Sequence, residues 1–259
     1  MQRIYYIVLL FSVLLVSCED KIDINLNDAS PKVVIVGDLS NLSDQHQIRV
    51  SKTIAFNQPA NSIPVNDATV QVTEVGGRTY TFQLSDQNGN YSVRNMQLRV
   101  GRSYKLSVTV EGQLYESLSS VPPYVEVEKF GLKEESIFGE IYKYVVFTFT
   151  DPVGVENYYR YLISVNKKKM EFAAVLSDKF NDGLSVSHDI ANEDNDLVAG
   201  DEVVIRRQCI DKGVYRYWND FQLTNPGSAS PANPTSNITN GALGYFSTSS
   251  AKEYSTIIE

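Results

Sequence analysis

The sequence predicts a mainly β protein, in which an N-terminal β-sandwich is followed by a second β-rich domain with one short helix. Apolar and polar residues alternate with a period of two in many short segments, as they do in half-buried strands. Gly, Asn and Pro residues separate these segments at the spacing expected of turns. The chain contains 16 Tyr and 11 Phe but only one Trp and three Met, and such a composition favours strands over helices.

The N-terminal sandwich is predicted for residues 32–123. Its strands start at Val33-Val34-Ile35-Val36 and continue in the alternating runs 68–73, 79–82 and 104–110. Asn88-Gly89 is a turn signal between two of them, because Asn and Gly tolerate positive φ. Seven or so short strands in roughly 95 residues, with no helical period, are typical of an immunoglobulin-like sandwich.

The second β-rich domain is predicted for residues 124–259. Val121-Pro122-Pro123 marks the boundary, because two prolines interrupt both strands and helices. Further strands are predicted at residues 145–149, 159–165, 172–176, 202–210 and, after Gly241, up to about residue 258. The Ser-, Pro- and Asn-rich segment 228–240 is predicted to be an ordered loop.

One helix is predicted near residues 212–224. Asp211 is suited to be its N-cap, because a side-chain carboxylate can accept the first free backbone N–H groups. An apolar stripe with helical spacing is formed by Val214, Trp218 and Phe221. Asn225-Pro226-Gly227 then ends the helix.

The first 17 residues have the pattern of a bacterial lipoprotein signal peptide. Residues 4–16 are apolar apart from Ser12, and 13 residues are too few to cross about 30 Å of hydrocarbon as a helix. Leu15-Val16-Ser17-Cys18 then resembles a lipobox, which predicts lipidation of Cys18 and attachment to a membrane through the N-terminal lipid. The alternatives are an ordinary signal peptide with a chance Cys, or a buried strand.

Residues 18–31 are predicted to be an acidic tether that follows the lipid. Glu19 and Asp20 directly after Cys18 resemble the surface-export signal of Bacteroidetes lipoproteins. The resemblance implies a lipid-anchored protein of the outer membrane that faces the cell surface. The alternative is a solvated linker, in which acidic residues are common.

Charge and cysteine content exclude several classes of function. The formal net charge is −8, which argues against nucleic acid as a partner, because polyanions bind basic surfaces. Once Cys18 carries lipid, Cys209 is the only remaining thiol, so the mature chain has no intramolecular disulfide. Cys209 lies in an alternating segment and is predicted to pack as a small apolar residue.

The sequence predicts no catalytic residues, metal site or cofactor, and the chain is expected not to be an enzyme. The two histidines, His46 and His188, fall in different predicted domains and are both predicted to lie on the surface. HExxH, GxSxG, P-loop and dinucleotide-binding patterns are not found. The acidic residues between Asp189 and Glu202 could supply oxygen ligands for Ca²⁺, but they lack the spacing of an EF-hand. A solvated loop is preferred there.

The tyrosines at residues 158–161 invite a ligand-binding interpretation. A period of two places Tyr159 and Tyr161 on the core side of their strand and directs Tyr158 and Arg160 to the opposite side. Tyr158 and Arg160 are therefore the candidate contacts for a ligand or partner. Core packing is the preferred role for the cluster as a whole.

One part of the N-terminal sandwich resembles a known module. The motif is Asp86-x-x-Gly89-x-Tyr91 followed by Leu98-x-x-Gly101-x-x-Tyr104-x-Leu106-x-Val108. It is similar to the carboxypeptidase regulatory-like sandwich, a transthyretin-like β fold that is not itself a peptidase.

The mature chain as a whole resembles a Bacteroidetes lipoprotein family called domain of unknown function 4249. The matching blocks are Cys18-Glu19-Asp20, Asp151-Pro152-x-Gly154-x-Glu156-Asn157-Tyr158-Tyr159, Pro231-x-Asn233-Pro234-x-x-Asn237-Ile238 and Gly241-Ala242-Leu243-Gly244-Tyr245-Phe246. Members look like surface lipoproteins, often encoded beside TonB-dependent transporters. The resemblance implies a non-catalytic binding or accessory protein that works with such a transporter. The alternative is a structural or adhesion-type surface lipoprotein, and a hydrolase is least favoured.

Overall fold

The computed structural model describes residues 30–54, 62–192, 197–224 and 233–259. Within these ranges the chain forms fifteen strands and one helix, which confirms the mainly β prediction. The predicted signal peptide (1–17) and nearly all of the predicted tether (18–31) lie outside the described residues.

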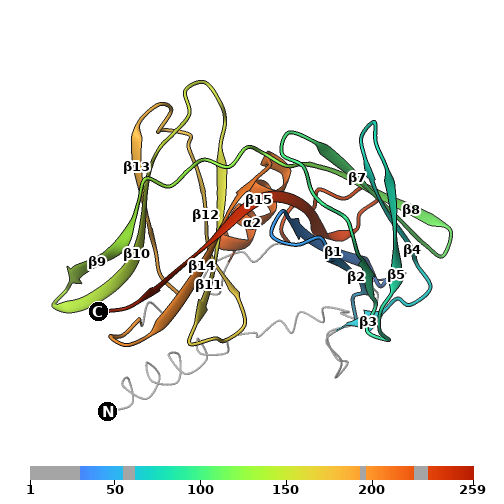
Figure 1. The fold of residues 1–259 in the computed structure, drawn as a ribbon. Helices are drawn as coiled ribbons and strands as arrows, with labels where there is room; N and C mark the ends of the chain where they lie inside the picture. Colours follow the sequence, from blue (N-terminus) through green and yellow to red (C-terminus); the bar gives the residue numbers. More distant parts are fainter. Residues whose placement is uncertain (1–29, 55–61, 193–196, 225–232) are drawn as a thin grey trace, which may run out of the picture.

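The first eight strands form one sandwich, on the right in Figure 1. They are β1 (Val33–Ser40), β2 (His46–Lys52), β3 (Ile63–Pro64), β4 (Thr69–Glu74), β5 (Thr79–Leu84), β6 (Asn90–Val93), β7 (Ser103–Val110) and β8 (Gln113–Ser120). Strand β5 pairs with both β6 and β4, so the sheet bends around the core. Side chains that alternate along each strand, such as Ile35, Val72 and Leu106, are fully buried there, as period-two patterning requires.

The next strands build a second sandwich with its own core. They are β9 (Lys129–Ile137), β10 (Glu140–Thr150), β11 (Tyr158–Val165), β12 (Glu171–Ser177), β13 (Ser185–Ile190) and β14 (Glu202–Ile210). The three-stranded sheet β13-β10-β9 packs against the row β12-β11-β14. The ring centroids of Phe149 on β10 and Tyr159 on β11 are 5.0 Å apart. The strand predicted at residues 145–149 lies within β10, and the side chains of Val145, Phe147 and Phe149 on its inner face are fully buried.

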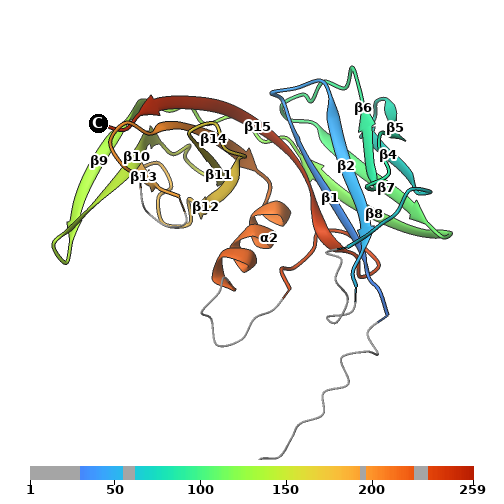
Figure 2. The ribbon, with the colours of Figure 1, turned by 90° about the horizontal axis from the view of Figure 1, so that it is seen from below.

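The last strand, β15 (Leu243–Ile257), belongs to both sandwiches. Residues 243–249 pair in parallel with β1, whereas residues 250–257 pair antiparallel with β14. Figure 2 shows β15 as an arch from one sandwich to the other. Gly244 permits the close approach to β1, because a Cβ atom there would lie 2.1 Å from the carbonyl oxygen of Ile35.

This arrangement corrects the predicted division into residues 32–123 and 124–259. Ile238, Ala242 and Phe246 are buried in the core of the first sandwich, although they lie more than 110 residues after the predicted boundary. The prolines at 122 and 123 do separate the strands of the two cores. The chain nevertheless returns to the first core at its end, because β1 offers a free edge for parallel pairing.

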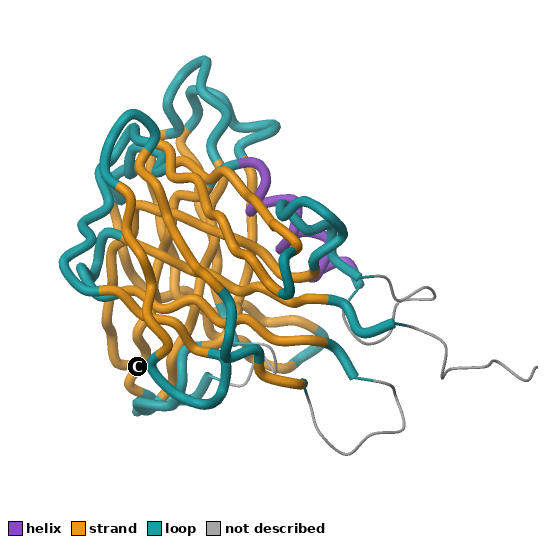
Figure 3. The backbone as a smooth tube through the Cα atoms, turned by 90° about the vertical axis from the view of Figure 1, so that its right-hand side faces the viewer, coloured by secondary structure: helices purple, strands orange, loops and turns teal. Residues whose placement is uncertain are grey.

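The helix α2 (Lys212–Leu223) lies inside the arch (Figure 2) and against the strands at one side of the molecule (Figure 3). Its predicted N-cap is confirmed, since Oδ1 of Asp211 accepts the backbone N–H groups of Gly213 and Val214 at 2.9 and 3.0 Å. Val214 is fully buried, whereas Phe221 at the end of the predicted stripe is 39% exposed. The described part of the predicted loop, residues 233–240, forms neither helix nor strand.

Candidate functional site

The segment between β10 and β11 is held in place by carboxylates from the loop that follows β12. The backbone N–H of Gly154 donates to Oδ1 of Asp182 at 2.6 Å, and the backbone N–H of Asn157 donates to Oδ2 of Asp178 at 2.6 Å. Gly154 has a φ of +73°, which suits a glycine in this turn. These contacts fix the residues that lead into β11.

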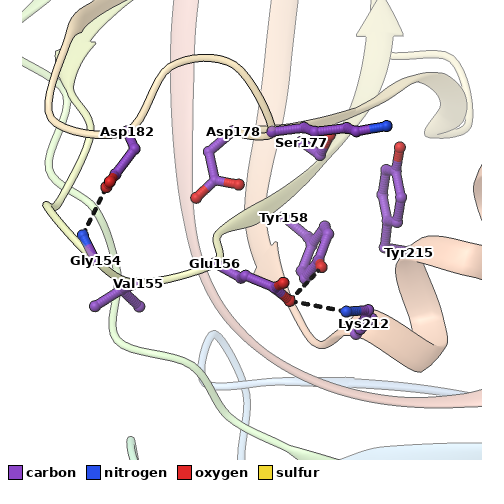
Figure 4. A pocket seen from close by; sticks show the side chains of 10 residues that line it. Gly154, Val155, Glu156, Tyr158, Ser177, Asp178, Asp182, Lys212 and Tyr215 are labelled. Atoms are coloured by element: carbon purple, nitrogen blue, oxygen red, sulfur yellow. Dashed lines mark hydrogen bonds and ion pairs between the residues drawn. The ribbon is translucent and has the colours of Figure 1, made fainter.

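A cleft of about 530 Å³ lies between this segment and the start of α2 (Figure 4). The side chains that define it are those of Val155, Glu156, Tyr158, Asp178, Lys212 and Tyr215. Tyr158 comes from β11, and Lys212 and Tyr215 come from the first turn of the helix. The Asp211 cap therefore determines where one wall of the cleft stands.

Two paired interactions shape the floor and wall of the cleft. The rings of Tyr158 and Tyr215 stack with centroids 4.7 Å apart and planes inclined by 27°. Oε2 of Glu156 accepts the hydroxyl of Tyr158 at 2.8 Å and lies 3.0 Å from Nζ of Lys212. The two interactions share Tyr158, so the aromatic pair and the ion pair position each other.

The charges in the cleft are set by these contacts. The hydrogen bond from Lys212 lowers the pKa of Glu156, and the same contact raises the pKa of Lys212. Burial raises the pKa of Tyr158 above its usual value near 10. At neutral pH the cleft therefore presents a carboxylate, an ammonium group and a neutral phenol, which together can accept and donate hydrogen bonds.

The arrangement is suited to binding a polar molecule. Among the described residues that line the cleft, none is a histidine or a cysteine. Across the described ranges, no group of three or more His, Cys, Asp or Glu side chains is placed to hold a metal ion. The stacked tyrosines and the polar groups beside them are features of ligand pockets that fix a polar molecule.

A comparison with models of known protein families identifies the family of this chain. The model of the family "Domain of unknown function (DUF4249)" matches residues 19–255. The chain belongs to this family. The family predicted from the sequence motifs is thereby confirmed.

Other comparisons add little to the assignment of this DUF4249 chain. No curated protein matches it. A two-domain fibronectin type III segment of chicken tenascin is similar at 11% identity over 89% of this chain and 99% of that segment, with a TM-score of 0.24.

The structure places only one of the two predicted contact residues in the cleft. Tyr158 lines it, but the expectation that Arg160 is free to contact a ligand is wrong. Arg160 does point away from the sandwich core, but α2 covers that side of the sheet, and its side chain is 1% exposed. Its guanidinium lies 4.8 Å from the ring of Trp218 and pairs with Asp38 of β1.

The two histidines of the DUF4249 chain are buried, so their predicted surface position is also wrong. Nε2 of His46 bonds to the carbonyl oxygen of Met96 at 2.8 Å. Nδ1 of His188 lies 2.8 Å from the hydroxyl of Tyr161, which also accepts Nε–H of Arg207 at 3.0 Å. Burial lowers the pKa of His188 to about 4, so its imidazole is neutral at pH 7.

Sequence reasoning missed Lys212, Tyr215 and Asp178 as residues of the cleft. The motif from Asp151 to Tyr159 did include Glu156 and Tyr158, two of the residues that line the cleft. Its partners lie about 20 and 55 residues further along the chain, and no local pattern links them.

The predicted lipidation and export residues Cys18, Glu19 and Asp20 lie outside the described residues. In the described part of the chain, no helix has the length and apolar character needed to cross a membrane.

Proposed function

We propose that this DUF4249 chain is a lipid-anchored, non-catalytic binding protein of the outer-membrane surface, and that the cleft beside α2 holds its ligand. The observation that carries the proposal is the stacked pair Tyr158–Tyr215 next to the ion pair Glu156–Lys212. A cleft that places aromatic ring surface beside paired hydrogen-bonding groups favours the binding of a polar ligand.

The ligand class that fits best is a polar, hydroxyl-rich molecule such as an oligosaccharide. Glu156 and Lys212 neutralise each other, so the pair offers a hydrogen-bond acceptor and donor without a strong net charge. The two tyrosines offer apolar ring surface beside those groups, and a sugar has both apolar C–H and polar O–H surfaces. An oligosaccharide of few units would fill a cleft of about 530 Å³.

The sequence supports the anchoring part of the proposal. Residues 1–17 would direct secretion, Cys18 would carry the lipid, and Glu19 with Asp20 would direct export to the cell surface. Replacing Cys18 with Ala should leave the protein unprocessed or released from the membrane. Metabolic labelling with a fatty acid that still marks the Cys18→Ala variant would contradict this.

A TonB-dependent transporter is the proposed partner, because a surface protein that binds a nutrient needs a route to pass it inward. Affinity purification of the tagged lipoprotein should then bring down a transporter barrel. A purely structural or adhesion-type role predicts that no transporter is recovered.

A glycan array probed with the mature chain tests the binding proposal. Glycans that bind the parent should lose at least about tenfold in affinity to Tyr215→Ala, because that change removes half of the stacked pair. Tyr142→Ala is the matched control, since Tyr142 lies on β10 and does not line the cleft. Equal affinity of the parent and Tyr215→Ala, or no bound glycan, would rule out the proposed ligand class.

A further inference from the structure

Strand β15 is paired on only one side over its second half. Residues 243–249 have β1 as a neighbour, but β1 ends at Ser40, and residues 250–257 pair with β14 alone. In the described chain, no strand pairs with residues 251–257 on the side that β1 vacates. The side chains of Lys252, Glu253, Ser255 and Ile257 are exposed there.

The hydrogen bonds at the end of β1 show which backbone groups face the open side. The N–H of Ala251 donates to Oδ1 of Asn41 at 2.6 Å, and the carbonyl oxygen of Ser249 accepts the N–H of Asn41 at 3.2 Å. Backbone groups alternate in direction along a strand. The N–H and C=O groups of Glu253, Ser255 and Ile257 therefore also point to the open side.

Two other strand edges of this chain, those of β8 and β12, are covered. On β8, Glu116 exchanges hydrogen bonds with Thr239, and the carbonyl of Leu114 accepts from Asn240. On β12, the N–H of Val175 donates to the side chain of Gln222 of α2. An exposed edge is a template for pairing with another chain, and proteins usually cover it. Among the described residues, 251–257 have no such cover on their outer side; β9 and β13 also end their sheet without a second strand partner.

A groove of about 580 Å³ runs beside this open edge, between β14–β15 and β1–β2. Its charged side chains are those of Asp38, Arg49, Arg206 and Glu253. Glu253 is paired with Arg206 at 2.7 Å, and Asp38 is paired with the buried Arg160. Arg49 donates to the hydroxyl of Ser62 at 2.9 Å but has no carboxylate partner in the described ranges. Among the described residues, the groove therefore holds one cation without a carboxylate partner.

We infer that residues 251–257 of β15 are a docking site for an extended acidic segment of a partner protein. The segment adds a strand to the sheet in line with β1 and hydrogen-bonds to the outward backbone groups of Glu253, Ser255 and Ile257. Alternate side chains of the segment enter the groove, where an acidic residue pairs with Arg49. This surface is separate from the cleft beside α2 and does not depend on the ligand proposed for that cleft.

Selection from a phage library of short random peptides against the intact mature chain tests this inference. Acidic peptides should be enriched, and synthetic copies should slow hydrogen exchange at the amides of residues 253, 255 and 257. Ser255→Pro should weaken their binding at least about tenfold, because proline removes an outward N–H while leaving the bonds to β14 in place. Ser255→Ala is the matched control and should bind like the parent.

Arg49→Glu supplies an independent variant that leaves the strand untouched, and it should also weaken binding of the acidic peptides. The inference is overturned if no peptide is enriched, or if selected peptides bind Ser255→Pro and Arg49→Glu as tightly as the parent. It is also overturned if light scattering shows a dimer of the parent that Ser255→Pro abolishes, because the edge then serves a second copy of this chain.

Discussion

Arg160 on β11 and Asp38 on β1 form an ion pair, although β14 and β15 lie between their strands in the sheet. Arg160 is 1% exposed and Asp38 is 26% exposed on its side chain. Removing one partner of a buried pair leaves the other charge uncompensated. We expect Asp38→Asn to lower the free energy of unfolding by about 3 kcal/mol, near the low end of the range for such pairs because Asp38 is partly solvated.

Urea unfolding of the parent and of Asp38→Asn measures this cost. Glu253→Gln is the matched control, since it removes an exposed partner of Arg206 on the same sheet. Exposed pairs contribute about 0–1 kcal/mol. Similar stability losses in the two variants would show that Arg160 does not depend on Asp38.

Asp211 connects α2 to the first sandwich. Its Oδ1 caps the helix, whereas its Oδ2 accepts the N–H of Ser120 at 3.1 Å and the hydroxyl of Ser119. Asp211→Ala should cost more than the roughly 1 kcal/mol of an ordinary N-cap, because charge-assisted bonds to β8 are lost as well. Asp211→Asn keeps one acceptor oxygen and should fall between Ala and the parent in chemical denaturation. Equal losses in the free energy of unfolding for Asp211→Ala and Asp211→Asn would contradict the separate roles of the two oxygens, helix capping and bonding to β8.

The two sandwiches should unfold in one transition because they share β15. Trp218 is the only tryptophan of the chain and lies on α2, so its fluorescence reports on the second sandwich. Val72→Ala, deep in the first core, should lower stability by about 2 kcal/mol and shift the Trp218-detected midpoint by the same amount as the circular dichroism midpoint. An unchanged fluorescence midpoint would mean that the two halves unfold independently.

His188 should make the fold less stable in acid. Burial lowers the pKa of His188 from 6.5 to about 4, so the unfolded chain takes up a proton that the folded chain refuses. The contribution of neutral His188 to the free energy of unfolding is therefore fully present above about pH 6.5. It falls as the pH is lowered toward 4, by about 1.4 kcal/mol per pH unit. Denaturant unfolding at pH 7 and pH 4.5 should show a smaller acid loss for His188→Gln than for the parent. An identical pH dependence of the two proteins would show that His188 does not contribute to the loss of stability in acid.

Local patterns predicted most of the individual strands, and long-range contacts account for what they missed. The strand predicted at residues 202–210 has the same bounds as β14, in which Val203, Ile205, Arg207 and Cys209 are buried on one face. Strand β9 was not predicted, since its side chains are largely exposed and show no alternation. The parallel pairing of β15 with β1 joins residues about 210 positions apart, and no local sequence signal specifies such a pairing.

The candidate site was predicted only in part for the same reason. The period-two pattern of the strand correctly predicted that the side chains of Tyr158 and Arg160 point away from the core. It could not show that α2 would cover Arg160 and leave Tyr158 at the edge of a cleft, because that depends on where the helix docks. The buried position of His188 was missed because its partners, Tyr161 and Arg207, come from other strands.

The shared strand β15 also determines when the protein can fold during synthesis. The first sandwich needs Phe246 and its neighbours to close its core, and these residues are made more than 120 residues after β8, the preceding strand of that sandwich. The first sandwich therefore lacks a complete core until residue 246 has been synthesised, and pairing across such a separation is slow. A chain that folds late stays extended for longer, which is consistent with the secretion proposed above.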